Sequence, residues 1–510
     1  MGTRSNENDH WTLDLDTLGM GPTGDALTRA LVTCRPPFAV CVQGKWGSGK
    51  TSLMRYAMAG LGGEALGLTL QTSKRPASEL PGWLAESWKE RQRGAPGRIL
   101  EALKAQIDPS LHEHLSPDET RVLSVWFNPW QHQEASAPIV ALLQELRAQM
   151  TFLLRAREGL QRLAQVSVEA GVKILGELID AFVRGQVGVS PGVGRLVEGF
   201  AASAPADVAA QAQRVSMMFE EAVKRLLNVP GESEEEFRDA DGREVQTRRL
   251  VVFIDDLDRC SEAQAVRLLE GVKLYLQTRY CVFVFGLDGA AIRRAVERTL
   301  DGATPESAQE YLEKLFQATL HVPVTRTLQP FIEDLSARAG LAPEAHPALA
   351  ALLEPNPRKI KNFLNSLALA WATREPSGTV PDGERVVDYA LVQYLRLYHP
   401  EVSRLLTYDP SHLAGLHRVL QEGAFQPFPN ASPVELLFLR AFRHAGAQAL
   451  PAGAEPRHDR VEAVVTELLA RLDRHKSDRA FVLAWQKRYE DLTEADVVAR
   501  LGPVLRVGAP

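Results

Sequence analysis

The sequence has few cysteines, no long apolar run and no excess of basic residues. Its 510 residues include four cysteines, none in a metal-type pair, and this usage fits a reducing cytoplasm better than secretion. No uncharged apolar run reaches the roughly 18 residues that a membrane-spanning helix needs, and the N-terminus lacks the apolar stretch of a signal peptide. The net charge of -6 gives no support to nucleic acid as a partner, although a local basic face would not show in it. We therefore expect a cytoplasmic protein without a transmembrane segment.

Short apolar runs separated by helical patterns predict a parallel sheet. Strand–helix–strand alternation around such runs is typical of parallel strands that are covered on both faces. From about residue 330 onward no strand is convincing, and proline-punctuated helices continue to the end. We therefore expect an α/β fold with a central parallel sheet, helical insertions and an all-helical C-terminal region. The strands are expected at 38–43, 122–127, 250–254 and 281–287.

Residues 44–51 match the phosphate-binding pattern G-x-x-x-x-G-K-[ST] in full. An apolar strand precedes the pattern and a helix follows from about Lys50, which is the context that the motif requires. Glycines let backbone N–H groups turn toward phosphate oxygens, Lys50 supplies a mobile positive charge, and Thr51 offers its hydroxyl to Mg²⁺. The pattern predicts binding of a nucleoside triphosphate, most simply ATP. We expect the nucleotide to contact Gly44, Lys45, Trp46, Gly47, Ser48, Gly49, Lys50, Thr51 and Ser52.

An acidic segment follows the apolar run that ends at Ile254. Asp255 is placed to enter the Mg²⁺ shell, and Asp256 is placed to polarise the attacking water. Asp258 is a third carboxylate close by. Three acids after a buried strand are costly unless a cation neutralises them, so the metal interpretation is favoured over a cluster of helix caps. Together with the glycine-rich motif, this pattern predicts Mg²⁺-dependent ATP hydrolysis.

The segment 160–205 is ambiguous. Its charges fall at Glu169, Lys173, Glu177, Asp180 and Arg184, so a helix would carry one narrow polar stripe on an apolar cylinder. A core or interface helix is the favoured interpretation. A helix lying on a membrane surface is the alternative, but such helices usually carry a net basic face.

Six blocks of the sequence resemble the KAP family of P-loop NTPases, in the family's order. They extend over residues 35–370, about two thirds of the chain. Many members of this family carry a transmembrane hairpin between the two phosphate motifs, whereas this chain has charges every three or four residues there. The blocks are Gly44–Ser52, Val125–Gln131, Ile254–Cys260, Gly286–Asp288, Tyr311–Gln317 and Asn356–Phe363.

The resemblance implies a branch of the additional-strand P-loop ATPases, close to the STAND class. It implies a nucleotide-switched protein that forms homo-oligomers or complexes with partner effector proteins. Bacterial proteins of this kind occur in antiphage systems, one of which is the four-gene Qat system with a KAP-type ATPase as its first component. The implied division is an N-terminal segment at 1–34, a P-loop NTPase core at 35–325 with insertions at about 61–118 and 155–247, a helical lid at 326–400 and a helical C-terminal domain at 401–510.

Three further residues gain roles from the resemblance. Asp288 occupies the position of a γ-phosphate sensor, and a helix N-cap is the equal alternative. Arg358 could reach the phosphates from the helical lid, or lie on the surface of its helix. Arg259 could pair with one of the preceding aspartates as an orienting group, or act in trans across a subunit interface.

The motif around Trp126, Asn128 and Trp130 follows the second strand. We expect the tryptophans to serve packing. Their neighbours in sequence are uncharged, so no cation–π contact is expected from them.

The sequence favours an ATP-driven switch or assembly factor that acts on partner proteins, plausible in antiviral defence. It contains no recognisable nuclease, protease or deaminase motif. A DNA-translocating or DNA-remodelling motor is the alternative, which would need a basic channel. A scaffold that holds nucleotide without hydrolysing it is a second alternative, and the pair Asp255 and Asp256 argues against it.

Overall fold

The computed structural model forms two compact units, which are described separately. The larger is built chiefly from Met20–Pro323 and the smaller chiefly from Val324–Pro510. The structure describes residues 11, 15–61, 99–115, 120–133, 137–156, 162–183, 206–229, 237–276, 278–299, 304–323, 328–372, 383–422, 430–442 and 478–505.

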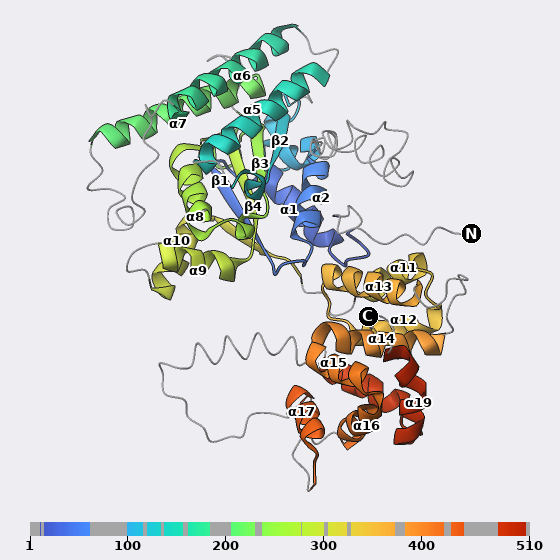
Figure 1. Cartoon of the computed structure of the whole chain (residues 1–510). Coiled ribbons are helices and arrows are strands. Elements are labelled where there is room, and N and C mark those ends of the chain that lie inside the picture. Colours follow the sequence, from blue (N-terminus) through green and yellow to red (C-terminus); the bar gives the residue numbers. More distant parts are fainter. Residues whose placement is uncertain are drawn as a thin grey trace. The chain divides into compact units, whose positions relative to one another are not determined.

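The larger unit contains a five-stranded sheet in which every pair of neighbours is parallel, with the order β2-β3-β4-β1-β5 (Figure 1). β3 and β4 are buried at every position, as expected for strands covered on both faces. β4 lies between β1 and β3, so the strand before the glycine-rich loop and the strand before the acidic segment are not neighbours. The expected α/β fold is confirmed. The strands are β1 (Phe38–Gln43), β2 (Arg121–Phe127), β3 (Arg248–Ile254), β4 (Cys281–Leu287) and β5 (Ala318–His321).

Helices cover both faces of this sheet. One face packs against α2, which in turn packs against α1, and the other belongs to a large apolar core shared with α5 to α10. Alternate strand residues serve the two faces: Val252 and Phe283 belong to that core, whereas Phe253 points the other way and stacks on Trp126. The helices are α1 (Gly21–Thr33), α2 (Lys50–Gly60), α5 (Pro138–Ala156), α6 (Arg162–Val183), α7 (Ala206–Leu227), α8 (Glu262–Gly271), α9 (Gly289–Thr299) and α10 (Pro305–Leu315).

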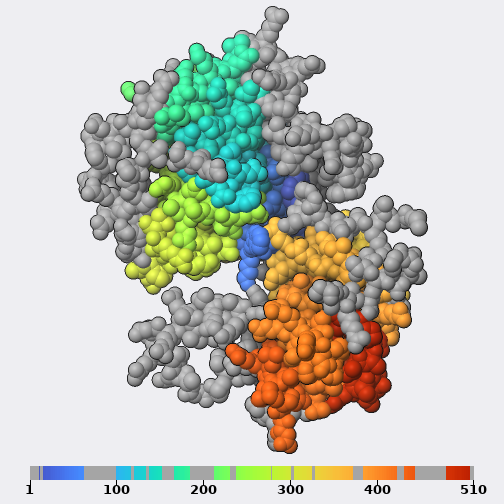
Figure 2. All heavy atoms as spheres, viewed as in Figure 1, coloured from blue at the N-terminus to red at the C-terminus, as the bar shows by residue number. Residues whose placement is uncertain are grey.

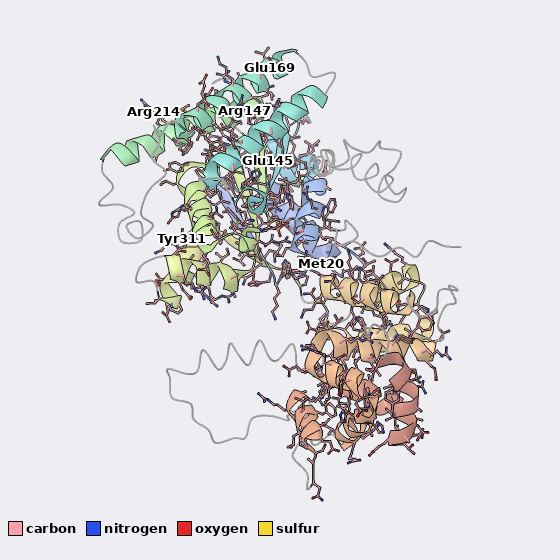
Figure 3. All side chains as sticks on the ribbon, in the orientation of Figure 1. Met20, Glu145, Arg147, Glu169, Arg214 and Tyr311 are labelled. Atoms are coloured by element: carbon pink, nitrogen blue, oxygen red, sulfur yellow. The ribbon has the colours of Figure 1, made fainter. Side chains whose placement is uncertain are left out.

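The helices α5, α6 and α7 lie side by side in Figure 1, and α5 and α6 form one closely packed block in Figure 2. Arg147 of α5 packs against Gly176 of α6, where an added Cβ would lie 3.1 Å from the guanidinium carbon. Figure 3 shows Glu169 on α6, where it is exposed together with Lys173 and Glu177. Residues between them, such as Leu175, are buried. The narrow polar stripe and the packed helix expected here are present over the described residues; Arg184 lies outside them.

A side-chain amide covers part of the sheet's β2 edge. Gln149 of α5 accepts a hydrogen bond from the backbone N–H of Trp126 at 3.2 Å and donates to the Trp126 carbonyl at 2.6 Å. A third bond, donated by the amide to Glu145, fixes it further (the labelled Glu145 lies on the same helix in Figure 3). Gln149 thus occupies the place that a neighbouring strand would take.

The smaller unit contains only helices among its described residues, which agrees with the expected helical C-terminal region. Its interior holds the buried carboxylate of Asp388, which accepts bonds from Arg488, Tyr489 and Arg500. Because a buried charge must be paired, this network joins three helical segments at one point. The helices are α11 (Gln329–Arg338), α12 (His346–Leu352), α13 (Pro357–Ala372), α14 (Gly383–Tyr398), α15 (Pro400–Tyr408), α16 (Leu413–Glu422), α17 (Pro433–Phe442) and α19 (Glu494–Leu505), besides helical residues 478–488.

Across the part of the chain that the structure describes, no helix combines the length and the apolar character needed to cross a membrane. All four cysteines are free thiols.

Candidate nucleotide and metal site

The loops that carry the predicted site leave the sheet at one edge. Parallel strands place their carboxyl ends together, and the register pairs Gln43 of β1 with Leu287 of β4, and Phe127 of β2 with Ile254 of β3. The glycine-rich loop, the acidic segment and Asp288 therefore all follow the carboxyl ends of strands, on the same side of the sheet. Ligands of open α/β sheets bind at such a carboxyl edge.

The glycine-rich loop has the backbone that a phosphate cradle requires. Gly47 and Gly49 have φ angles of 78° and 98°, in the left-handed region that glycine tolerates without strain. The helix α2 begins directly after Gly49, and no side chain caps its first turn. Its N-terminal N–H groups and positive dipole end are thus available to an anion.

Lys50 and Ser48 complete this cradle. The buried Lys50 ammonium donates to the carbonyl oxygens of Gly44 at 2.8 Å and Lys45 at 3.3 Å, and it lies 3.7 Å from Asp258 Oδ2. The Ser48 hydroxyl is buried and has no hydrogen-bond partner. A buried hydroxyl without a partner is costly, and a phosphate oxygen would supply the missing one.

The loop and the acidic segment are joined by one hydrogen bond. Thr51 Oγ1 donates to Asp255 Oδ2 at 2.7 Å. Burial and the neighbouring Asp256 raise the pKa of Asp255 to about 6. A divalent cation would offset the free-energy cost of burying the ionised Asp255 carboxylate. A hydroxyl and a carboxylate oxygen are ligands that Mg²⁺ accepts beside phosphate oxygens and water. Among the described residues, no group of three or more His, Cys, Asp or Glu side chains is arranged to hold a metal alone. The residues fit Mg²⁺ that arrives with a nucleotide.

Each carboxylate oxygen of Asp256 has a polar partner. Asn128 Nδ2 donates a hydrogen bond to Oδ2 at 2.9 Å, and Arg259 forms an ion pair in which its Nε lies 2.8 Å from Oδ1. Asn128 follows β2 directly, and its own side-chain oxygen accepts from the Trp130 N–H. Arg259 therefore pairs with one of the preceding aspartates, as one sequence interpretation held. The role of Asn128 was missed, because it depends on β2 lying next to β3, which the sequence pattern does not reveal.

The tryptophans have cationic partners, so the expectation of no cation–π contact was wrong. The Arg55 guanidinium lies 3.6 Å from the Trp126 ring centroid, and Arg259 lies 5.7 Å from that of Trp130. Both arginines come from other elements, α2 and the turn after β3, which neighbours in sequence do not reveal. Burial lowers the pKa of Arg55 to about 10, while Asp255 acts in the opposite direction.

Asp288 and Arg358 lie at helix starts. Asp288 follows β4, and its Oδ1 accepts from the Ala290 N–H at 3.0 Å in the first turn of α9. The N-cap contact is therefore present, and the sensor role stays a prediction. Arg358 belongs to the smaller unit, where its backbone N–H donates to Asn356 Oδ1 at 3.1 Å at the start of α13. The reach of its guanidinium to the phosphates also stays a prediction.

Comparison with known proteins gives a family match over most of the chain. The family described as KAP family P-loop domain matches residues 22–372. No curated protein matches. Among solved structures, the Aeropyrum pernix ORC1 protein in complex with DNA is similar at 14% identity and a TM-score of 0.32, over 96% of this chain and 95% of that chain. At this TM-score the similarity carries no functional inference.

Proposed function

This chain belongs to the KAP family of P-loop NTPases, and on that premise we propose that it binds and hydrolyses ATP with Mg²⁺. The hydrolysis drives a switch or assembly step in partner proteins. The site residues support ATP binding and hydrolysis. The absence of a recognisable effector motif in the sequence and the resemblance to nucleotide-switched proteins of the family support the action on partner proteins.

The contact between Thr51 and Asp255 is the observation that carries the proposal. These residues are 204 positions apart in sequence, yet the hydroxyl and the carboxylate oxygen lie 2.7 Å apart. Thr51 follows the phosphate-binding lysine directly, so a cation held here would also meet the terminal phosphates. When bound, Mg²⁺ would neutralise charge on the β- and γ-phosphate oxygens.

The chain's own residues would supply binding, charge and a base. The N-terminal N–H groups of α2 bind phosphate oxygens, and Lys50 leaves its carbonyl partners to meet the β- and γ-phosphates. Asp256, held next to Asp255, orients the attacking water and accepts its proton. Asp288 and Arg358 are proposed to contact the γ-phosphate, from the end of β4 and from the helical unit.

ATP hydrolysis by this chain is proposed to change the conformation or the assembly of other proteins. The sequence contains no recognisable nuclease, protease or deaminase motif, so a second chain would supply any effector chemistry. We propose that this activity serves bacterial antiviral defence, within homo-oligomers or complexes with effector proteins; the resemblance to proteins found in antiphage gene clusters supports this role.

Turnover of purified protein tests the proposal. We expect Mg²⁺-dependent release of phosphate from ATP, and its loss in Lys50→Ala, because the ammonium that holds the β- and γ-phosphates is gone. Lys104→Ala is the matched control, since Lys104 pairs with Glu101 outside the site. Equal turnover in Lys50→Ala and wild type would overturn the site. Several-fold stimulation by DNA would favour a DNA motor instead, and loss of phage protection in cells carrying Lys50→Ala would support the defence role.

A further inference from the structure

The side chain proposed as the base is anchored on two sides. Asn128 donates a 2.9 Å hydrogen bond to Oδ2 of Asp256, and Arg259 forms an ion pair with the other oxygen, its Nε lying 2.8 Å from Oδ1. The backbone of Asp256 is also unusual, with a φ of 58° in the left-handed region. Left-handed backbone costs energy for a residue other than glycine, and it occurs where the surrounding contacts fix it. The carboxylate plane therefore has one preferred orientation.

Arg259 lies close to two aromatic rings from different segments. Its guanidinium carbon is 5.8 Å from the ring centroid of Trp46 and 5.7 Å from that of Trp130. Both distances are within the range in which a cation is attracted to an aromatic face. Trp46 is 61% exposed and Trp130 is 43% exposed. Tryptophans that serve only packing are usually far more buried.

We propose that Trp46 and Trp130 clamp Arg259, and that Arg259 and Asn128 are positioning residues that aim Asp256 at the attacking water. This inference rests on the proposed ATP hydrolysis and deepens it. The four residues bring together the phosphate loop, the end of β2 and the turn after β3. Trp46 belongs to the loop proposed to bind phosphate. Binding of the nucleotide is therefore connected, through Trp46 and Arg259, to the orientation of the Asp256 carboxylate.

The chemistry explains why arginine is suited to this place. A base is effective only within hydrogen-bond reach of the proton it removes, and a displacement of about 1 Å can lower the rate by about 100-fold. The planar guanidinium can bond a carboxylate edge while its faces lie against aromatic rings. A lysine would keep the charge but lose both geometric features. The clamp is therefore expected to affect the chemical step more than the binding of ATP.

Steady-state kinetics of Arg259 variants test the proposal. Arg259→Met is expected to lower kcat by about 10- to 100-fold while KM for ATP changes less than about threefold. Arg259→Lys should recover only part of this loss. Arg298→Met is the matched control, because Arg298 forms an exposed ion pair with Glu262 at 2.7 Å in the same unit. Unchanged kcat in Arg259→Met would overturn the proposal.

A double variant separates positioning from direct contact with phosphate. Once Asp256→Asn has removed the base, adding Arg259→Met should cost little more, because Arg259 acts through Asp256. A loss of the same size in both backgrounds would show that Arg259 acts on the substrate itself and would overturn the proposal. Nucleotide binding and circular dichroism confirm that each variant is folded.

The aromatic clamp is tested by Leu and Phe variants of each tryptophan. Trp46→Leu and Trp130→Leu should lower kcat, and Trp46→Phe and Trp130→Phe should recover most of it, since phenylalanine keeps an aromatic face. Equal kcat in the Leu and Phe variants would overturn the clamp. A wild-type chain without Mg²⁺-dependent turnover overturns the proposed function as well, whereas wild-type turnover with a normal Arg259→Met variant overturns the positioning role alone.

Discussion

Thr51 Oγ1 donates a 2.7 Å hydrogen bond to Asp255 Oδ2, and this bond links the glycine-rich loop to the strand β3. The two oxygens are the pair proposed to enter the Mg²⁺ shell. Asp255 is buried and its pKa is raised to about 6, chiefly by burial. The hydrogen bond thus holds the Asp255 carboxylate in place. A divalent cation bound there would offset the free-energy cost of burying its charge.

Removal of the Thr51 hydroxyl is expected to weaken the response to Mg²⁺. Thr51→Val keeps the shape of the side chain but loses one oxygen ligand, a loss of about 1.5–3 kcal/mol, so half-maximal turnover should need about 10- to 100-fold more Mg²⁺. Thr51→Ser restores the hydroxyl and should behave nearly as wild type. Titration of ATPase rate against Mg²⁺ measures this. The same Mg²⁺ dependence in Thr51→Val and wild type would contradict the assignment.

Asp256→Asn is expected to bind ATP but not to turn it over. The amide keeps the size of the side chain and loses the base, so kcat should fall by about 10²- to 10⁴-fold. Purified variant exposed to ATP should retain ATP, where wild type yields ADP. Asp241→Asn, in an exposed turn, is the control. If binding were lost instead, Asp256 would belong to the nucleotide or metal contacts and not to the base.

Asp288 has an observed cap contact and a proposed sensor role, which two substitutions separate. Asp288→Ala removes the bond to the Ala290 N–H and should lower the free energy of unfolding by about 1 kcal/mol. Asp288→Ser can still cap the helix, so its stability should stay within a few tenths of a kcal/mol. Its ATPase rate then reports the sensor role alone. A lowered kcat supports that role, and a wild-type rate leaves Asp288 as a cap.

Glu270 of α8 is expected to make stability depend on pH. Burial raises the pKa of Glu270 to about 7, from an ordinary 4.5, and its buried Oε1 has no hydrogen-bond partner. A raised pKa in the folded state means that stability is present at pH 4.5 and is lost as pH rises through 7. Tyr311 of α10, labelled in Figure 3, has a buried hydroxyl without a partner, and Glu270 contributes to the upward shift of its pKa.

Glu270→Gln should remove this dependence. At pH 8 the variant is expected to be more stable than wild type by about 1–2 kcal/mol after allowance for solvent screening, with little difference near pH 5. Denaturant unfolding at the two pH values measures it. Glu313→Gln, at an exposed position on α10, should show no such difference. Equal pH profiles for Glu270→Gln and wild type would mean that the carboxyl is solvated.

Much of the sheet could be predicted because apolar runs are a local property. The run at 38–43 has the bounds of β1, and those at 122–127 and 281–287 fall on β2 and β4 within one residue. The strand β5 was not predicted. It has four residues whose exposure alternates, and it pairs with β1 at the edge of the sheet. So short and half-exposed a segment gains its conformation from the neighbouring strand more than from its own residues.

The candidate site was predictable where residues are adjacent in sequence. The loop at 44–51 and the acids at 255–258 each form one pattern, and parallel strands explain why they meet. The contacts around these motifs were not predictable. Asn128 bonds Asp256 across 128 positions, and Arg55 of α2 lies over the ring of Trp126 in β2, an element far from α2 in sequence. Such contacts depend on which strands are neighbours, and the sequence pattern does not fix the strand order.

The amide of Gln149 at the edge of β2 has a consequence for assembly. An open strand edge can recruit a strand from another molecule and start uncontrolled association. Here the backbone groups of Trp126 are already bonded, so an incoming strand would first have to displace α5. Growth by strand addition is thus disfavoured at this point of the sheet. Copies of the chain that associate there would have to meet through the surface of α5 and not by adding a strand.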